Sequence, residues 1–197
     1  MPRLHTTADA VLRTVTGSRA QVLRSFSGQV LQLTGASAAG ISIFNSRSCD
    51  ELTWESVSGN MQEFTGRRFP LRNSMCGICL EKREPQLFRW PHRYFAWMAQ
   101  NGILVAEALV VPLCGVGNDV YGTVWAATDT ALGTFSRQHA NDMLALGAVA
   151  TAALRYRSER EGGATPLESP PDERRGEPGA ASTYIGESRR DRRRVHM

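Results

Sequence analysis

The feature that most limits the fold of this chain is the long segment between Gly59 and Ala106, in which strand patterns nearly vanish. Before it, residues 39–44 and 52–57 favour two strands that form a hairpin. After it, residues 107–113 and 120–128 give the strongest strand patterns of the chain, joined by a short turn. A connection this long inside a compact domain must carry elements of its own. We expect this excursion to lie over the sheet and to cover a small-molecule pocket.

The excursion is predicted to contain short elements. They are a helix near 61–65, a helix over 75–82 that begins after Ser74, a strand at 86–89 and a helix over 92–100. The serine is a favourable N-cap, and a proline precedes the last helix, where proline is well tolerated.

Apolar residues at helical spacing mark both ends of the folded region. The first pattern runs from Thr7 to about Leu33 and is interrupted at Gly17, and the second begins at Ser136. Beyond the second helix, Gly, Pro, Ser and charged residues dominate, which predicts disorder. The predicted domains are an N-terminal helical segment (1–18), a globular domain (19–158) and an Arg-rich tail (159–197).

Charge, apolar runs and cysteine spacing limit the cellular location and the classes of partner that we expect for this protein. The net charge of +4 includes a terminal cluster of arginines at 189–194, but no aromatic residues alternate with them, so nucleic-acid binding is not expected. No apolar run is long enough to span a bilayer, and the N-terminus has no export pattern. Four cysteines at irregular spacing do not indicate a disulfide framework. We expect a cytoplasmic protein without a membrane contact.

The strand pattern at 120–128 has two different faces. Gly122, Val124 and Ala126 form a small-residue face, which suits close packing under the small residues of the C-terminal helix. By elimination, Tyr121, Thr123 and Trp125 are predicted to face the excursion. The predicted pocket therefore depends on the surroundings of Trp125.

Helix, hairpin, long excursion, hairpin and long helix is the element order of a GAF domain, and several short motifs resemble that family. The similarity covers roughly residues 20–155, and the chain resembles the GAF modules that precede histidine kinases and other bacterial signalling outputs. The matching motifs are Cys76-Gly77 at a helix start, Pro85 to Phe88, the aromatic stretch after Pro91, Glu107 to Pro112, Gly122 to Asp129, and Phe135-Ser136.

This resemblance implies an α+β fold: an antiparallel sheet with the N- and C-terminal helices on one face and the excursion covering a pocket on the other. It implies a non-catalytic small-molecule-sensing or regulatory module in bacterial signal transduction. Its expected partners are an unidentified small molecule and a second copy, which would contact it through the first and last helices, or a signalling protein such as a histidine kinase. No cofactor or metal is expected. A ligand-free dimerisation or scaffold module is an alternative.

Candidate ligand-binding residues follow from the predicted pocket and from the aromatic part of the excursion. Tyr94 or Trp97 could stack on an anionic ligand, or these aromatic residues could simply pack a lid helix. The positive charge for such a ligand could come from Arg89, His92 or Arg93. Trp54 is favoured as sheet core, Glu107 as the partner of a lid arginine, and Asp129 as a turn residue. The complete candidate set is Trp54, Cys76, Arg93, Tyr94, Trp97, Glu107, Tyr121, Thr123 and Trp125.

Cys76 and Cys79 offer a second kind of site. Cys76 lies in the first turn after Ser74, where a helix N-terminus favours the thiolate. The pair could be redox active or supply half of a zinc site, but no second ligand pair stands at metal spacing. Small, partly buried residues at a helix start are the favoured interpretation.

The enzymatic alternative is a thiol-dependent reductase of free methionine sulfoxide, a more distant GAF relative. Cys76 and Glu107 match positions of that pattern. The other two cysteines of the family have no counterpart, since Gly66 or its neighbours stand at one of these places, and apolar residues from Trp125 to Ala127 replace its acidic pair. Only Cys79 could resolve an oxidised Cys76. The preferred prediction is that no residue is catalytic, with Cys76 and Cys79 involved only under this alternative.

Overall fold

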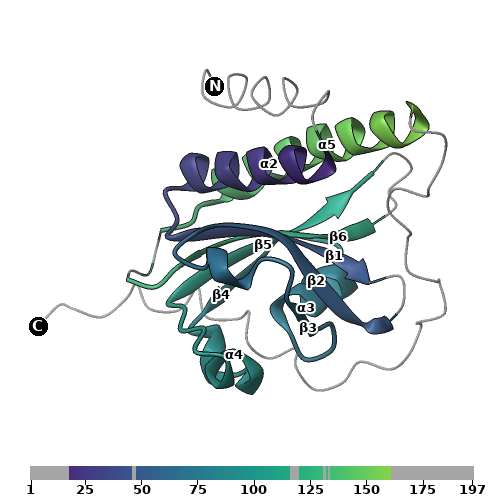
Figure 1. Ribbon diagram of the computed structural model, residues 1–197. Helices are drawn as coiled ribbons and strands as arrows, with labels where there is room; N and C mark the ends of the chain where they lie inside the picture. The colour runs from purple at the N-terminus through teal and green to yellow at the C-terminus, as the bar shows by residue number, and fades with distance from the viewer. Residues whose placement is uncertain (1–17, 46–47, 116–119, 131, 133, 161–197) are drawn as a thin grey trace, which may run out of the picture.

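The computed structural model describes residues 18–45, 48–115, 120–130, 132 and 134–160 of the chain. The predicted N-terminal segment up to residue 17 and the tail after residue 160 lie outside the described residues. Within them the elements follow the predicted order, with helices at both ends and an excursion between two strand pairs (Figure 1).

The described strands form one six-stranded antiparallel sheet in the order β3-β2-β1-β6-β5-β4. Four strands were expected at these places and a fifth at 86–89, and all are present. β3 was missed because three residues are too few to show an alternating pattern. The bounds are β1 Ala38–Asn45, β2 Ser48–Gly59, β3 Arg68–Pro70, β4 Gln86–Arg89, β5 Glu107–Cys114 and β6 Val120–Thr128.

Two long helices, α2 (Arg19–Thr34) and α5 (Arg137–Arg160), cover one face of the sheet (Figure 1). The break predicted near Gly17 agrees with the start of α2: Ser18 is its N-cap and forms a capping box with Gln21. The helices and this face of the sheet share one core, which we call the helix-side cluster. It includes Phe26, Val30, Ile41, Val124, Ala126, Met143 and Leu146.

The excursion lies on the opposite face (Figure 1). Its short helices are η1 (Gln62–Phe64), α3 (Met75–Lys82), η2 (Pro91–Arg93) and α4 (Ala96–Gln100). The prediction of α3 is confirmed at both ends. The prediction of one helix over 92–100 is wrong, because the chain leaves helical geometry at Phe95, whose side chain is buried. The excursion and the sheet share the excursion-side cluster, which includes Trp54, Phe69, Cys76, Cys79, Phe95, Met98 and Trp125.

Candidate functional site

Trp125 lies in the excursion-side cluster, as predicted, but its surroundings are filled. Its indole packs on Trp54, with ring centroids 4.5 Å apart, and its Nε1 donates a hydrogen bond to Ser42 Oγ at 3.1 Å. On β1, a Cβ added at Gly40 would stand 2.4 Å from Cζ2 of the indole. The side chain is 3% exposed. The predicted position of the pocket is therefore corrected: aromatic side chains occupy the space around Trp125.

The faces of β6 agree with the prediction at Val124, Ala126 and Trp125 but not at Tyr121. Tyr121 packs with the helix-side cluster, and its ring lies against Gly115, where an added Cβ would meet Cε2 at 2.3 Å. The β5–β6 register shifts between Leu113 and Cys114, next to this position. Strict alternation fails where the ladder is irregular, so Tyr121 is not brought to Trp125. Thr123 is fully buried and lies against Cys76 on the excursion side.

Trp54 and Trp97 are part of one aromatic stack. Trp54 is 3% exposed and stands 4.3 Å from Phe69, centroid to centroid, so the favoured prediction of sheet core is confirmed. Trp97 packs on Phe69 at 5.0 Å, and its Nε1 donates to the carbonyl of Asn73 at 3.2 Å. Both side chains pack against other aromatic rings on the excursion side, and their own ring centroids are 6.5 Å apart.

Arg93 and Tyr94 lie at the surface of the excursion. Tyr94 is 53% exposed, and Arg93 is exposed with its guanidinium over the ring of Trp90 at 5.0 Å. Trp125 is in the interior, so the structure does not bring these two side chains together with it.

Cys76 and Cys79 are in α3 and are buried, at 7% and 0% exposure. Ser74 caps the helix by accepting a hydrogen bond from Gly77 N, as predicted. Burial nevertheless raises the pKa of Cys76, and side-chain hydrogen bonding lowers it only in part. Burial also raises the pKa of Cys79, whose thiol donates to the carbonyl oxygens of Glu84 and Val110. Desolvation therefore outweighs any stabilisation of the Cys76 thiolate by the helix terminus.

Glu107 is fully buried at the start of β5. Its Oε1 stands 3.6 Å from Nε of Arg89 on β4, which confirms the predicted arginine partner. Its Oε2 accepts hydrogen bonds from the backbone N–H groups of Thr134 and Phe135 at 2.8 and 3.1 Å. The sequence did not indicate this second role. The carboxylate connects the edge of the sheet to the segment that leads into α5.

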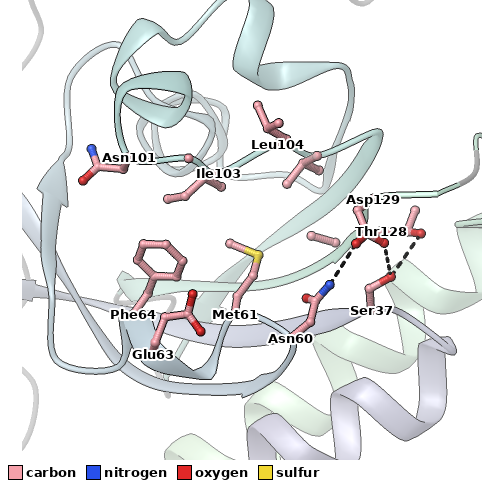
Figure 2. Close-up of a pocket in the computed structure, with 13 residues that line it drawn as sticks. Ser37, Asn60, Met61, Glu63, Phe64, Asn101, Ile103, Leu104, Thr128 and Asp129 are labelled. Atoms are coloured by element: carbon pink, nitrogen blue, oxygen red, sulfur yellow. Dashed lines mark hydrogen bonds between the residues drawn. The ribbon is translucent and has the colours of Figure 1, made fainter.

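A pocket of about 540 Å³ opens at one end of the sheet, on the side of the excursion (Figure 2). The segment after β2 contributes Met61 and Phe64, and the segment after α4 contributes Ile103 and Leu104. The end of β6 contributes Asp129.

The register of the strands brings together the polar residues at one end of this pocket. Ala38 pairs with Gly59 on β2 and with Ala127 on β6, so Ser37 lies between Asn60 and the end of β6. Asp129 accepts a hydrogen bond from Ser37 Oγ at 2.8 Å on Oδ1 and from Asn60 Nδ2 at 2.9 Å on Oδ2. Asp129 directly follows the end of β6, which agrees with the turn interpretation, but the sequence did not reveal its two partners. Only the pairing of three separate strands brings them together.

The described residues contain neither a metal-ligand group nor a membrane-spanning helix. In the ranges that the structure describes, no three His, Cys, Asp or Glu side chains gather as a metal-ligand group. Among the helices described, none is both long and apolar enough to cross a bilayer.

Comparison with known proteins gave matches among solved structures. No family model and no characterised protein sequence matches this chain. The GAF domain of a phosphoenolpyruvate-protein phosphotransferase from Coxiella burnetii has a TM-score of 0.66 at 15% identity, over 81% of this chain and 96% of that one. The GAF-B domain of DevS from Mycobacterium smegmatis gives 0.59 at 21% identity, over 73% and 98% of the two chains.

A free methionine-R-sulfoxide reductase from Neisseria meningitidis is similar to the same extent. It has a TM-score of 0.65 at 16% identity, and the match covers 80% of this chain and 89% of that one. The comparison spans GAF domains of two other proteins and an enzyme, so the shared property is architecture. The six-stranded antiparallel sheet, the paired terminal helices and the covering excursion show that this protein has the fold of a GAF domain.

Proposed function

We propose that this protein is a non-catalytic regulatory GAF module. One observation carries the proposal: Cys76 and Glu107, the two residues that match the sulfoxide-reductase pattern, are both buried and both have structural contacts. Burial raises the pKa of Cys76, which opposes formation of the thiolate that would attack a sulfoxide. The Glu107 carboxylate is occupied by two backbone N–H groups and stands beside Arg89.

The arrangement of Glu107 also supports a regulatory role. The residue begins β5 where the excursion ends and pairs with Arg89 on β4, which lies within the excursion. Its carboxylate also accepts hydrogen bonds from the backbone just before α5. A ligand or partner that moves the excursion would act on the start of α5 through this carboxylate. The similar GAF folds of the phosphotransferase and of DevS are consistent with such a module.

The output is proposed to act through a second copy or a signalling protein such as a histidine kinase. The helices α2 and α5 pack side by side, and α5 presents exposed residues such as Ala145, Ala148 and Ala152 on its outer face. Small side chains allow a second helix to approach closely. A scaffold module without any ligand remains the second candidate, favoured by the filled space around Trp125.

The non-catalytic proposal is tested by offering the purified protein free methionine sulfoxide with thioredoxin, thioredoxin reductase and NADPH. We expect no NADPH oxidation above a protein-free control. In parallel, brief treatment with iodoacetamide at pH 8, followed by peptide mass spectrometry, should modify half-buried Cys114 before Cys76. Turnover that is lost in Cys76→Ser would refute the proposal.

The assembly proposal is tested by light scattering after size exclusion. We expect a dimer mass for the wild type and a monomer mass for Ala148→Arg on α5. The matched control is Ala99→Arg at an exposed position of α4, which should remain dimeric. A wild-type monomer at high concentration would exclude the homodimer and leave a partner protein as the proposed target.

A further inference from the structure

The pocket at the end of the sheet has a chemical character that the core around Trp125 does not have. Thirteen described residues line it, and the charged ones among them, Glu63 and Asp129, are both acidic. No Lys, Arg or His belongs to this described lining. The charged groups that line the pocket therefore favour a cation over an anion. Arg67, whose guanidinium lies 4.9 Å from the ring centroid of Phe64, is not among the lining residues.

Asp129 is held in one orientation by Ser37, which directly precedes β1, and by Asn60, which directly follows β2. Ser37 Oγ donates to one carboxylate oxygen and Asn60 Nδ2 donates to the other. Each carboxylate oxygen can accept two hydrogen bonds, so a further donor can be accepted on both without displacing these partners. An ammonium or guanidinium group would therefore meet an acceptor whose position is already fixed.

The rest of the pocket is suited to an apolar body. In Figure 2, Met61 and Phe64 lie on one side of the space and Ile103 on the other. Leu104 also lines the pocket and is 62% exposed, one of the large apolar side chains that the fold leaves in water. A bound apolar group would cover part of this surface, which is a favourable contribution. Glu63 lies away from Asp129 in the same view, with Met61 between them.

We propose that this pocket binds a small organic cation, with its ammonium or guanidinium group on Asp129 and its aliphatic or aromatic body between Met61 and Ile103. The inference rests on the proposed regulatory function, for which it names the class of ligand. It also moves the sensing site from Trp125 to the end of the sheet. Since Asp129 is exposed, the ion pair adds little affinity. Simple amines should therefore bind weakly, in the millimolar range.

The experiment is a titration of the ¹⁵N-labelled protein with n-pentylamine, 1-pentanol and pentanoate, followed by backbone and Asn side-chain resonances. We expect pentylamine to shift Asn60, Gly102, Ile103 and Asp129. Asp129→Asn, which keeps the shape of the side chain, should weaken pentylamine about fivefold, the effect of one exposed ion pair. Glu81→Gln on α3 is the matched control, because it removes the same charge outside the pocket, and it should leave the affinity unchanged.

Two further measurements distinguish the contribution of the charge to the affinity from that of the apolar contact. The affinity of the wild type for pentanol should be no higher than the affinity of Asp129→Asn for pentylamine. Its affinity for pentanoate should be lower still. Leu104→Ser changes an exposed side chain, so the fold should tolerate it, and it should weaken pentylamine and pentanol by the same factor. Equal affinity for amine and alcohol, or shifts centred on Trp125, would overturn the inference. These results are independent of sulfoxide turnover, so either proposal can fail without the other.

Discussion

The indole of Trp125 on β6 lies directly on the backbone of Gly40, its cross-strand partner on β1. A Cβ atom at position 40 would stand 2.4 Å from Cζ2 and 2.8 Å from Cε2 of the ring. No side chain larger than a hydrogen atom fits there while the tryptophan keeps its place. The glycine and the tryptophan together define the filled centre of the excursion side.

The first prediction concerns this contact. Gly40→Ala should lower the free energy of unfolding by about 1–3 kcal/mol, because the methyl group overpacks against the indole. The matched control is Gly28→Ala on α2, where a Cβ meets nothing within 4 Å and alanine is the better helix former. Urea denaturation of both variants measures the effect, and an equal change at the two positions would contradict the packing argument.

The second prediction concerns the hydrogen bond between Trp125 Nε1 and Ser42 Oγ. Ser42→Ala leaves a buried N–H group without its acceptor, which should cost about 1–3 kcal/mol of unfolding free energy. Trp125→Phe removes the donor, so adding Ser42→Ala to it should cost less than Ser42→Ala does alone. The double-mutant cycle gives the coupling energy, and a value near zero would mean that the bond has no share in stability.

The third prediction concerns Glu107. Glu107→Gln replaces one acceptor oxygen by an amide N–H₂ or forces the side chain to turn. We expect a loss of about 1–3 kcal/mol and faster hydrogen exchange at the amides of Thr134 and Phe135. Glu51→Gln is the control, since Glu51 is 42% exposed and 4.0 Å from Arg68, and it should change stability by less than about 0.5 kcal/mol. Unchanged exchange at both amides would exclude the proposed link to α5.

The fourth prediction concerns pH. Burial raises the pKa of Cys76 and Cys79 above the ordinary value of 9.0, so the folded protein keeps both thiols protonated where the unfolded chain ionises. Their contribution to stability is complete below pH 9.0 and is lost as pH rises above it toward the folded-state values. Each thiol should add up to about 1.4 kcal/mol per pH unit to this decline.

Urea denaturation between pH 8 and 10.5 tests this linkage. Cys76→Ala should decline less steeply than the wild type, whereas Cys114→Ala should change the slope less, because Cys114 is only half-buried. Parallel curves for the wild type and Cys76→Ala would show that the Cys76 thiol is not shielded from ionisation.

Much of the architecture could be predicted from local patterns in the sequence. α3 begins after Ser74 because a serine N-cap is a local signal, and β5 and β6 follow from long apolar runs. The small-residue face of β6 lies toward the helices, as the sequence indicates. The sequence patterns missed β3 and the break at Phe95, since both features arise from contacts with distant residues and not from the local sequence. β3 exists because it pairs with β2, and the chain breaks where Phe95 enters the core.

The sequence by itself determined which residue types are available and on which side of a regular strand they lie. It therefore placed Trp125 under the excursion and gave Glu107 an arginine partner. Only the tertiary structure decided whether the space around Trp125 is empty or filled, because that depends on the side chains of Trp54, Gly40 and Ser42 from other strands. It also brought Ser37, Asn60 and Asp129 together, since a site assembled from three strand ends has no continuous sequence signal.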